Sequence, residues 1–279
     1  MAEKRSAGTT ATTTPGTAVS ADGTIIAYEK SGSGPAVVLV DGALCYREFG
    51  PARSLAATIA DRFTVYAYDR RGRGSSGDTA PYDVAREIDD LRAVIEAASA
   101  QTHATEIAVY GISSGAGLAL EAAAAGVPMR ALITYEAPYI AAGWKDQDVD
   151  HLAALRALLA RGKRGAAVGY FMVRMVGAPA IAPLFMRAMP TVWKQLKGAA
   201  HTLPNDVRVM SGFRAPTDRL AGIAVPTLVL VGGKAAPAMR EAQDEVAAAI
   251  PGARFGVLEG QTHQVADTVI GPRIVEFAG

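Results

Sequence analysis

The sequence predicts an α/β fold: a mostly parallel sheet of eight strands flanked by helices, with a helical lid inserted between two of the strands. Two observations support this prediction. Short runs of β-branched and apolar residues alternate with longer segments of helical periodicity, a pattern typical of parallel strands joined by crossover helices. Between residues 137 and 224 this alternation stops and only helical patterns remain, which indicates an insertion.

The strands and helices follow from local patterns of apolar residues. Residues 36–40 are apolar throughout, as in buried parallel strands. Residues 82–98 carry one apolar face at helical spacing. Strands are expected around Ala18 and at 24–29, 36–40, 63–68, 106–110, 131–135, 227–231 and 254–258, and helices at 47–60, 82–98, 114–125, 237–250 and 270–277.

The chain divides into three parts by composition and pattern. Residues 1–19 are rich in Ala, Thr and Ser, lack the apolar stretch of a signal peptide, and predict a disordered tail. Residues 20–136 and 225–279 form the α/β core, and residues 137–224 form the lid. An independent domain is the alternative for 137–224, but the return of strand patterns afterwards favours an insertion.

Charge and cysteine content exclude several classes of function. The 28 basic and 27 acidic residues give no electrostatic basis for binding nucleic acid or an anionic membrane. No stretch approaches the ~20 apolar residues of a membrane-spanning helix. The single cysteine, Cys45, cannot form an internal disulfide, which is compatible with the cytoplasm, and we expect it to be a small buried apolar side chain. We expect no metal and no organic cofactor, and the oligomeric state stays open.

The motif Gly-Ile-Ser-Ser-Gly at 111–115 indicates the chemistry. It lies between an apolar strand pattern and a helix of small residues, the context of a G-x-S-x-G nucleophile elbow. The turn is so tight that the neighbours of Ser113 must lack bulk, and the serine hydroxyl is raised near the helix N-terminus. An ordinary Gly-Ser turn is the alternative, which the strand–turn–helix context disfavours. Ser113 is therefore the expected nucleophile.

His263 is the expected base, because it follows the last predicted strand at the edge of the sheet where α/β proteins bind ligands. His103 lies in a polar loop, and His151 and His201 lie in the insertion.

The segment Asp-Gly-Ala at 41–43 directly follows the strand at 36–40. A glycine at this point lets backbone N–H groups turn toward the nucleophile. We expect an oxyanion hole formed by the N–H of Ser114 together with that of Gly42 or Ala43.

Together these motifs resemble the α/β-hydrolase superfamily over nearly the full chain past the tail. The segment D-R-R-G-R-G-S-S at 69–76 is similar to the family's D-x-R-G-x-G-x-S, whose role there is mainly architectural. Two positions depart from the family pattern. The usual His-Gly of the oxyanion loop is Asp41-Gly42 here, and the residue before the nucleophile, often His, is Ile112. Both backbone donors remain, while the polarity near the nucleophile changes.

The resemblance implies a carboxylate that orients His263. Most relatives carry it after the strand that corresponds to 227–231, but the loop at 232–240 contains no Asp or Glu. Glu136, which ends the strand at 131–135, is the expected acid. This placement resembles zearalenone lactonases, which also share the G-x-S-S-G-A elbow, and a subgroup of haloalkane dehalogenases.

Two alternatives to Glu136 stay open. In both of them Glu136 has a structural role, either as the cap of a lid helix or as the partner of an arginine. In the first alternative the acid is Asp146, Asp148 or Asp150. In the second, Ser113 and His263 act as a dyad with water.

The resemblance implies a serine hydrolase that cleaves a carboxylic ester or lactone through an acyl-enzyme. A serine nucleophile argues against haloalkane dehalogenation, which uses Asp at that position. Met and aromatic residues in the lid indicate an apolar small-molecule substrate, although they also suit the lid's own core. The expected pocket residues are Ile112, Met172, Met175, Met186, Met189 and Trp193. The alternatives are a C–C bond hydrolase, a lyase or a cofactor-free perhydrolase on the same fold, and a non-catalytic small-molecule receptor.

Overall fold

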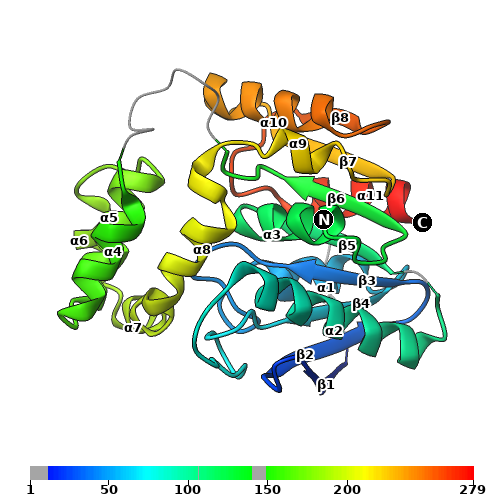
Figure 1. The fold of residues 1–279 in the computed structure, drawn as a ribbon, viewed down its shortest axis with the longest axis horizontal. Helices are drawn as coiled ribbons and strands as arrows, with labels where there is room; N and C mark the ends of the chain where they lie inside the picture. The colour runs from blue at the N-terminus through cyan, green and yellow to red at the C-terminus, as the bar shows by residue number, and fades with distance from the viewer. Residues whose placement is uncertain (1–11, 106, 140–148) are drawn as a thin grey trace, which may run out of the picture.

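Eight strands and five helices build the core of the computed structural model, which describes residues 12–105, 107–139 and 149–279 (Figure 1). The strands are β1 (Thr13–Val19), β2 (Ile25–Gly32), β3 (Ala36–Val40), β4 (Thr64–Tyr68), β5 (Ala108–Ile112), β6 (Ala131–Tyr135), β7 (Thr227–Gly232) and β8 (Arg254–Leu258). The core helices are α1 (Ala52–Ile59), α2 (Val84–Thr102), α3 (Ser114–Ala124), α10 (Pro237–Ala249) and α11 (Asp267–Ala278).

The strands form one sheet in the order β1-β2-β4-β3-β5-β6-β7-β8. The pairs β1–β2 and β2–β4 are antiparallel, and the remaining pairs are parallel. Helices α1 and α11 cover one face of the sheet, and α2, α3 and α10 cover the other. This is the predicted fold class, with the predicted number of strands.

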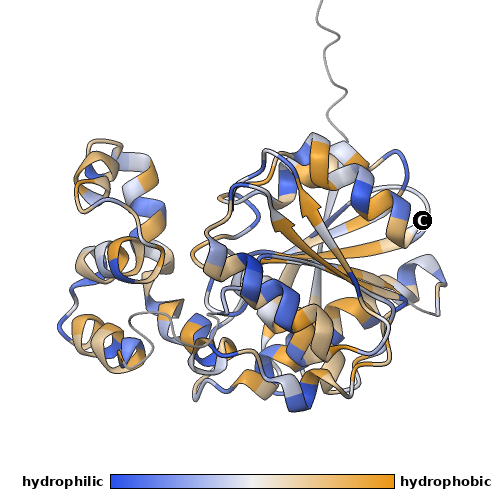
Figure 2. Cartoon of the chain, turned by 90° about the horizontal axis from the view of Figure 1, so that it is seen from above, coloured by the Kyte–Doolittle hydropathy of each residue, from blue (hydrophilic) through white to orange (hydrophobic). Residues whose placement is uncertain are grey.

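The central strands are buried on both faces, which explains their continuous apolar sequence. Every residue of β3, β4, β5 and β6 is buried. Successive side chains of a strand point to opposite faces. Thus Val38 and Val40 pack under α2 and α3, while Val37 and Leu39 pack under α1 and α11. Figure 2 shows the resulting band of hydrophobic residues along the strands.

The two largest differences between predicted and observed boundaries concern residues 13–19 and the start of α1. Part of the expected tail, Thr13–Val19, forms β1, because its β-branched residues pair with β2 and place Ala18 opposite Ile26. The rest of that prediction, residues 1–11, lies outside the described residues. Helix α1 begins at Ala52 instead of residue 47, because Arg47 is held in the preceding loop by Asp69, which accepts from its backbone N–H at 2.8 Å and from its guanidinium at 2.9 Å.

The described residues between β6 and β7 form helices and loops. They are α4 (His151–Ala160), α5 (Arg164–Tyr170), η1 (Phe171–Met175), α6 (Ala182–Arg187), α7 (Pro190–Ala199), η2 (Ala200–Thr202), α8 (Leu203–Val209), η3 (Ser211–Phe213) and α9 (Thr217–Leu220). Most of these helices lie to one side of the sheet around a hydrophobic cluster of their own. Helix α8 packs against both α4 and α3 and so joins the insertion to the core.

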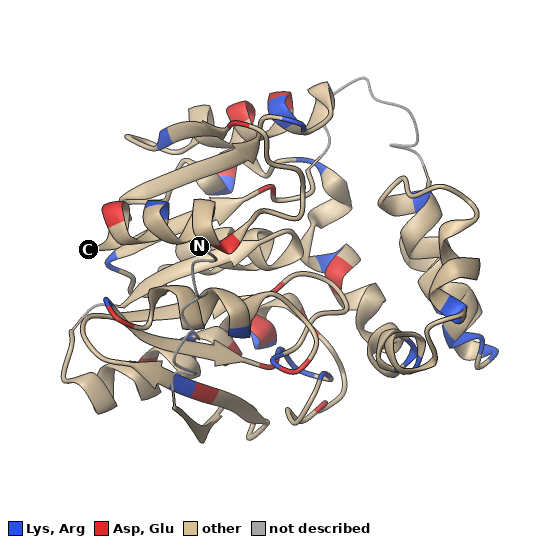
Figure 3. Cartoon of the chain, turned by 180° about the vertical axis from the view of Figure 1, so that it is seen from behind, with Lys and Arg blue, Asp and Glu red and all other residues tan. Residues whose placement is uncertain are grey.

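Charge is unevenly distributed between the insertion and the core. Residues 151–199 contain eight Lys and Arg and no Asp or Glu, whereas the rest of the chain contains 20 basic and 27 acidic residues (Figure 3). Within the described part of the chain, no helix combines the length and the hydropathy needed to span a membrane.

Candidate active site

Polar residues follow five strands at one edge of the sheet. Asp41 follows β3, Ser113 follows β5 and Glu136 follows β6, while Lys234 and His263 lie in the loops after β7 and β8. The carboxyl ends of parallel strands meet at one edge of a sheet, which is where α/β proteins bind their ligands. Four of these five residues, all except Asp41, line one cavity of about 300 Å³ between this edge and the insertion.

Ser113 occupies a strained turn between β5 and α3. Its φ of 57° lies in the left-handed region, which a non-glycine residue rarely adopts. The turn is tight because the start of α3 packs against the end of β3. A Cβ on Gly115 would lie 2.1 Å from the Val40 carbonyl oxygen, and one on Gly111 would lie 2.6 Å from the Gly115 carbonyl oxygen. These glycines therefore permit the predicted nucleophile elbow.

Glu136 and His263 are hydrogen-bonded at this edge. The Glu136 Oε2 lies 2.7 Å from the His263 Nδ1, and the Glu136 Oε1 accepts the Gly232 N–H at 2.8 Å. The carboxyl group is buried, and the backbone at Glu136 is again left-handed, with a φ of 45°. Because Nδ1 faces the carboxylate, the other ring nitrogen of His263, Nε2, is the one left to act as a base.

The pairing of β5 with β6 brings Ser113 and Glu136 together. Ile112 pairs with Tyr135, so the residue after each leaves the sheet at the same level. Ser113 and His263 line the same cavity. A direct hydrogen bond between them is not among the contacts of the described residues, and such bonds often tighten only in the substrate complex.

The other carboxylates considered as the acid do not meet His263 in the described structure. Asp150 caps α4, where it accepts the Ala153 N–H at 2.8 Å. Asp146 and Asp148 lie outside the described residues. The residues that the structure describes therefore bring one carboxylate, Glu136, to His263.

The predicted oxyanion donors lie beside the nucleophile. A Cβ on Gly42 would lie 2.8 Å from the Ser113 Cβ, so only glycine fits there. Ala43 and Ser114 both line the cavity. Ser114 is the first residue of α3, where backbone N–H groups have no acceptor within the helix.

Asp41 is a buried carboxyl group beneath this turn. One of its oxygens, Oδ2, has no hydrogen-bond partner among the described residues. Burial raises the pKa of Asp41 to about 7, although the Arg73 and Arg70 guanidinium groups oppose this shift.

Cys45 lies near the same turn as a free thiol. Burial raises its pKa to about 12, and the nearby Asp41 carboxylate adds to this shift. A thiol with so high a pKa stays protonated at neutral pH and is a poor nucleophile. Cys45 is of intermediate exposure, so it is less buried than predicted, although an unreactive thiol agrees with a packing role.

Comparison with known proteins decides the family. The sequence profile described as the alpha/beta hydrolase family matches residues 32–269. The chain belongs to the α/β-hydrolase family. A crystal structure of an alpha/beta hydrolase from Sphaerobacter thermophilus is 48% identical in sequence, with a TM-score of 0.85 over 95% of this chain and 100% of that chain.

Two further structures share the α/β-hydrolase fold at lower identity. A thermophilic esterase from Thermogutta terrifontis is 20% identical, with a TM-score of 0.67 over 94% of this chain and 96% of its own. The enol-lactonase from Burkholderia xenovorans LB400 is 20% identical, with a TM-score of 0.66 over 94% and 99% of the two chains. At this identity the likeness shows the fold alone. Among curated proteins, the comparison finds no match.

Most of the predicted pocket residues of this α/β-hydrolase do not line the cavity. Met175 does, but Met172, Met186 and Trp193 pack into the hydrophobic cluster of the insertion. Met189 is 45% exposed. Short inserted helices must bury apolar side chains against one another. Most of the expected pocket residues in the insertion are therefore packed in its own hydrophobic cluster.

Ile112 is also placed wrongly by the prediction. It packs in the hydrophobic cluster under α1 and α11 and does not line the cavity. Along β5 side chains alternate between the faces, and Ile112 falls on the α1 side.

Several residues that line the cavity are not among the expected pocket residues. Phe171, Val176, Met210 and Phe213 supply apolar walls from the inserted segment, and Asp206 of α8 reaches the cavity from the same segment. Their positions depend on how the insertion folds back over the core. Lys234 also lines the cavity, in the loop where most relatives carry the acid.

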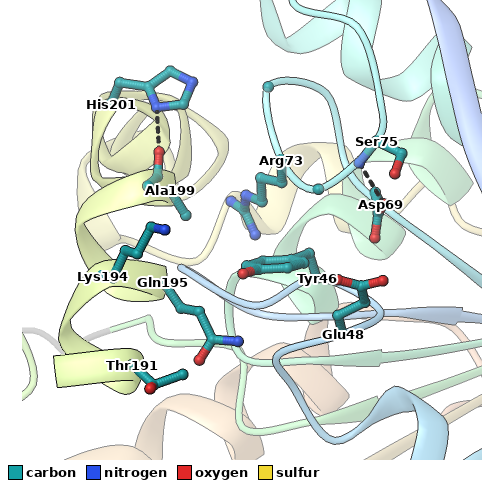
Figure 4. Close-up of a pocket in the computed structure, with 13 residues that line it drawn as sticks. Tyr46, Glu48, Asp69, Arg73, Ser75, Thr191, Lys194, Gln195, Ala199 and His201 are labelled. Carbon is teal, nitrogen blue, oxygen red and sulfur yellow. Dashed lines mark hydrogen bonds between the residues drawn. The ribbon is translucent and has the colours of Figure 1, made fainter. Parts of the chain in front are cut away.

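A second and larger cleft, of about 660 Å³, lies between α7 and the core (Figure 4). Lys194 and His201 line it from the insertion, and Tyr46, Glu48 and Arg73 line it from the loops after β3 and β4. Neither Ser113 nor His263 lines this cleft. Among the residues that the structure describes, no group of three His, Cys, Asp or Glu side chains could hold a metal ion.

Proposed function

We propose that the chain is a serine hydrolase that cleaves a carboxylic ester or a lactone of an apolar small molecule through an acyl-enzyme. The observation that carries this proposal is the 2.7 Å pair of Glu136 and His263 in the same cavity as the elbow serine, Ser113. A nucleophile, a base and an acid that orients the base are the components that acyl transfer to serine requires.

In the first step, the Ser113 Oγ adds to the substrate carbonyl carbon, and the His263 Nε2 takes the hydroxyl proton. Glu136 fixes the tautomer of the ring and stabilises the imidazolium that forms. The negative charge that develops on the carbonyl oxygen is stabilised by the N–H of Ser114 and that of Gly42 or Ala43.

The tetrahedral intermediate then collapses. The bond to the leaving oxygen breaks, His263 gives its proton to that oxygen, and the acyl group stays on Ser113. A water molecule attacks the acyl-enzyme while His263 takes one of its protons. The second intermediate releases the carboxylic acid, and the proton returns to Ser113.

The cavity supports a small apolar substrate. Its volume of about 300 Å³ lies at the lower end of ligand pockets. Apolar side chains form most of its wall, namely Ala43, Pro138, Phe171, Met175, Val176, Met210, Phe213, Ala235, Ala236 and Met239. Solved structures of an esterase and of an enol-lactonase share the fold, which agrees with this substrate class.

Covalent labelling tests this proposal. A fluorophosphonate should label the wild-type chain on the peptide that contains Ser113, and Ser113→Ala should not react. The wild type should also hydrolyse at least one member of a panel of short aryl esters and lactones. Labelling without any turnover on the panel would favour C–C bond hydrolysis, a lyase or a perhydrolase. An unlabelled wild type would contradict the proposal and favour a receptor.

A further inference from the structure

A buried polar network lies behind the nucleophile, and the mechanism above does not use it. Arg73 donates from Nη1 to the Gly42 carbonyl oxygen at 2.6 Å, and from Nη2 to both Asp206 oxygens at 2.7 and 2.8 Å. The Asp206 Oδ1 also accepts the Ser114 hydroxyl at 2.7 Å. Arg73, Asp206 and Ser114 are all at most 3% exposed.

Arg73 contacts the peptide unit that supplies an oxyanion donor. The Gly42 carbonyl and the Ala43 N–H belong to the same planar trans peptide, so they point in opposite directions. With Arg73 on the carbonyl side, the N–H faces away from the guanidinium, and Ala43 lines the cavity. A cation on the carbonyl oxygen also polarises the peptide and strengthens its N–H as a donor.

The second oxyanion donor is held by the same network. The Ser114 hydroxyl contacts Asp206 at 2.7 Å and accepts from the Arg70 Nη1 at 3.0 Å. These contacts fix the residue whose N–H begins α3. Burial opposes the ionisation of Asp206, but the Arg73 and Arg70 guanidinium groups outweigh it and hold the pKa of Asp206 below its ordinary value. Asp206 is therefore an anion at neutral pH.

We infer that Arg73 and Asp206 are positioning residues of the oxyanion hole. Arg73 orients the Gly42–Ala43 peptide, and Asp206 fixes the positions of Arg73 and Ser114 through its hydrogen bonds to both. This inference rests on the proposed function. Asp206 belongs to α8, the helix that joins the insertion to the core, so it couples the inserted helices to the donors beside Ser113. Figure 4 shows the Arg73 side chain between the inserted helix and the loop that carries Tyr46.

The chain contains a matched ion pair with a structural role alone. Arg71, two residues before Arg73, donates from Nε and Nη2 to the two oxygens of Asp90 at 2.6 and 2.7 Å. Arg71 and Asp90 are at most 1% exposed, and their hydrogen bonds reach neither the oxyanion turn nor Ser114. Variants of this pair therefore report the cost of breaking a buried ion pair without any effect on the donors.

The experiment compares Asp206→Asn and Arg73→Lys with Asp90→Asn and Arg71→Lys. We expect kcat for an aryl ester to fall about 10- to 100-fold in the first two variants, since loss of one oxyanion donor costs about 10²–10³-fold. KM should change less than about threefold. The affinity for a trifluoromethyl ketone, which forms an anionic tetrahedral adduct with serine, should fall by a similar factor to kcat. The Asp90 and Arg71 variants should keep kcat within about threefold of the wild type.

Two results would overturn the inference. The first is that Asp206→Asn and Arg73→Lys lower the thermal stability as much as Asp90→Asn and Arg71→Lys do, but keep the wild-type kcat and the wild-type affinity for the ketone. If Asp206→Asn does not fold, Ser114→Ala replaces it, because this variant removes only the hydroxyl group that contacts Asp206. The second result that would overturn the inference is a wild-type kcat in both Ser114→Ala and Arg73→Lys. An inactive and unlabelled wild type would contradict the proposed function instead, so the two failures are distinguishable.

Discussion

Ser113 and Glu136 leave neighbouring strands with left-handed backbones, at φ values of 57° and 45°. Such conformations cost about 1–3 kcal/mol each and persist only where the surroundings hold them. Here the Ser113 N–H donates to the Tyr135 carbonyl at 2.9 Å, and the Glu136 N–H donates to the Leu230 carbonyl at 3.1 Å. The sheet ladder thus extends one residue beyond each strand and turns both side chains toward the cavity.

Asp41 makes the stability of the fold depend on pH. In the folded chain burial raises the pKa of Asp41 to about 7, from an ordinary value near 4. As the pH rises through this interval, the unfolded chain loses the proton while the folded chain keeps it, so the free energy of unfolding falls. Asp41→Asn cannot ionise. Its free energy of unfolding relative to the wild type should therefore rise by up to about 4 kcal/mol between pH 4 and pH 8.

Urea unfolding of both proteins at pH 4, 6 and 8 measures this difference. Arg70, Arg73 and Asp69 contribute charges near Asp41 and are present in both proteins. A difference between the variants that stays constant with pH would show that Asp41 is ionised in the fold over this whole range.

Local sequence predicted Ser113, His263 and Glu136, which the structure brings to one cavity, but not the residues that contact the turn at Ser113 from behind. Ser113 follows from the elbow, His263 from its place after the last strand, and Glu136 from a charge at the end of an apolar strand. Asp206 carries no comparable signal, because it lies 92 residues from its partner Ser114 and only the folded insertion brings them together. The arginines at 70 and 73 lie in a recognised segment, yet their contacts with the oxyanion turn depend on tertiary structure.

At the scale of elements, the elbow depends on how closely α3 approaches β3. A Cβ on Gly115 would meet the backbone carbonyls of Val40 and Asp41 at 2.1 and 2.6 Å, and neither can move without displacing a central strand. Gly115→Ala should therefore lower the free energy of unfolding by several kcal/mol, or prevent folding. Thermal denaturation measures the effect.

Gly198 is the matched control for Gly115. It lies in α7, its backbone is not left-handed, and a Cβ there would meet nothing within 4 Å. Gly198→Ala should therefore raise the free energy of unfolding by about 0.5–1 kcal/mol. Equal losses of stability in the two variants would contradict the account of the elbow.

The sequence predicted the kinds of elements better than their ends. All eight strand segments lie close to the runs of apolar and β-branched residues that indicated them. For the central strands β3 to β6, burial between helix layers requires such runs. The start of α1 depends instead on Asp69, which is distant in sequence and holds Arg47 in the loop. Residues 13–19 form a strand because they pair with β2.

For the whole molecule, the cavity proposed to bind substrate is lined by both the core and the insertion. Met175 and Phe213 line it, whereas Trp193 packs within the insertion under the Arg187 guanidinium, 5.5 Å from the ring centroid. Met175→Ala should enlarge the cavity and raise kcat/KM for long acyl esters relative to acetyl esters by about tenfold. Trp193→Ala should lower stability and leave this preference unchanged. A shift in acyl preference in Trp193→Ala alone would place the acyl site elsewhere.

The uneven charge predicts a dependence on salt. Eight basic residues and no acidic residue at 151–199 give the insertion a positive potential next to the cavity. The nearly balanced charge of the whole chain does not reveal this local excess. Anionic esters should be drawn toward it. We expect kcat/KM for an ester with a carboxylate on its acyl chain to fall severalfold between about 20 and 500 mM NaCl. A neutral ester of the same length is the control, and an equal response of both esters would contradict this prediction.

The insertion also contains most of the expected pocket residues that do not line the cavity. Its Met and aromatic residues suit either a substrate pocket or the insertion's own core. Five of the six expected pocket residues lie outside the cavity, four of them in the insertion. Composition shows that a segment is apolar, but not which of its side chains face its own core and which face the substrate.

The most direct test of the account is the kcat of Glu136→Gln on an aryl ester that the wild type hydrolyses, beside Ser113→Ala and Asp150→Asn. All three variants are first shown to be folded. The account predicts a fall of about 10³–10⁴-fold for Glu136→Gln, because His263 loses the carboxylate that fixes its tautomer. It predicts at least as large a loss for Ser113→Ala and wild-type activity for Asp150→Asn, whose carboxylate caps α4. Wild-type kcat in Glu136→Gln would contradict the central claim.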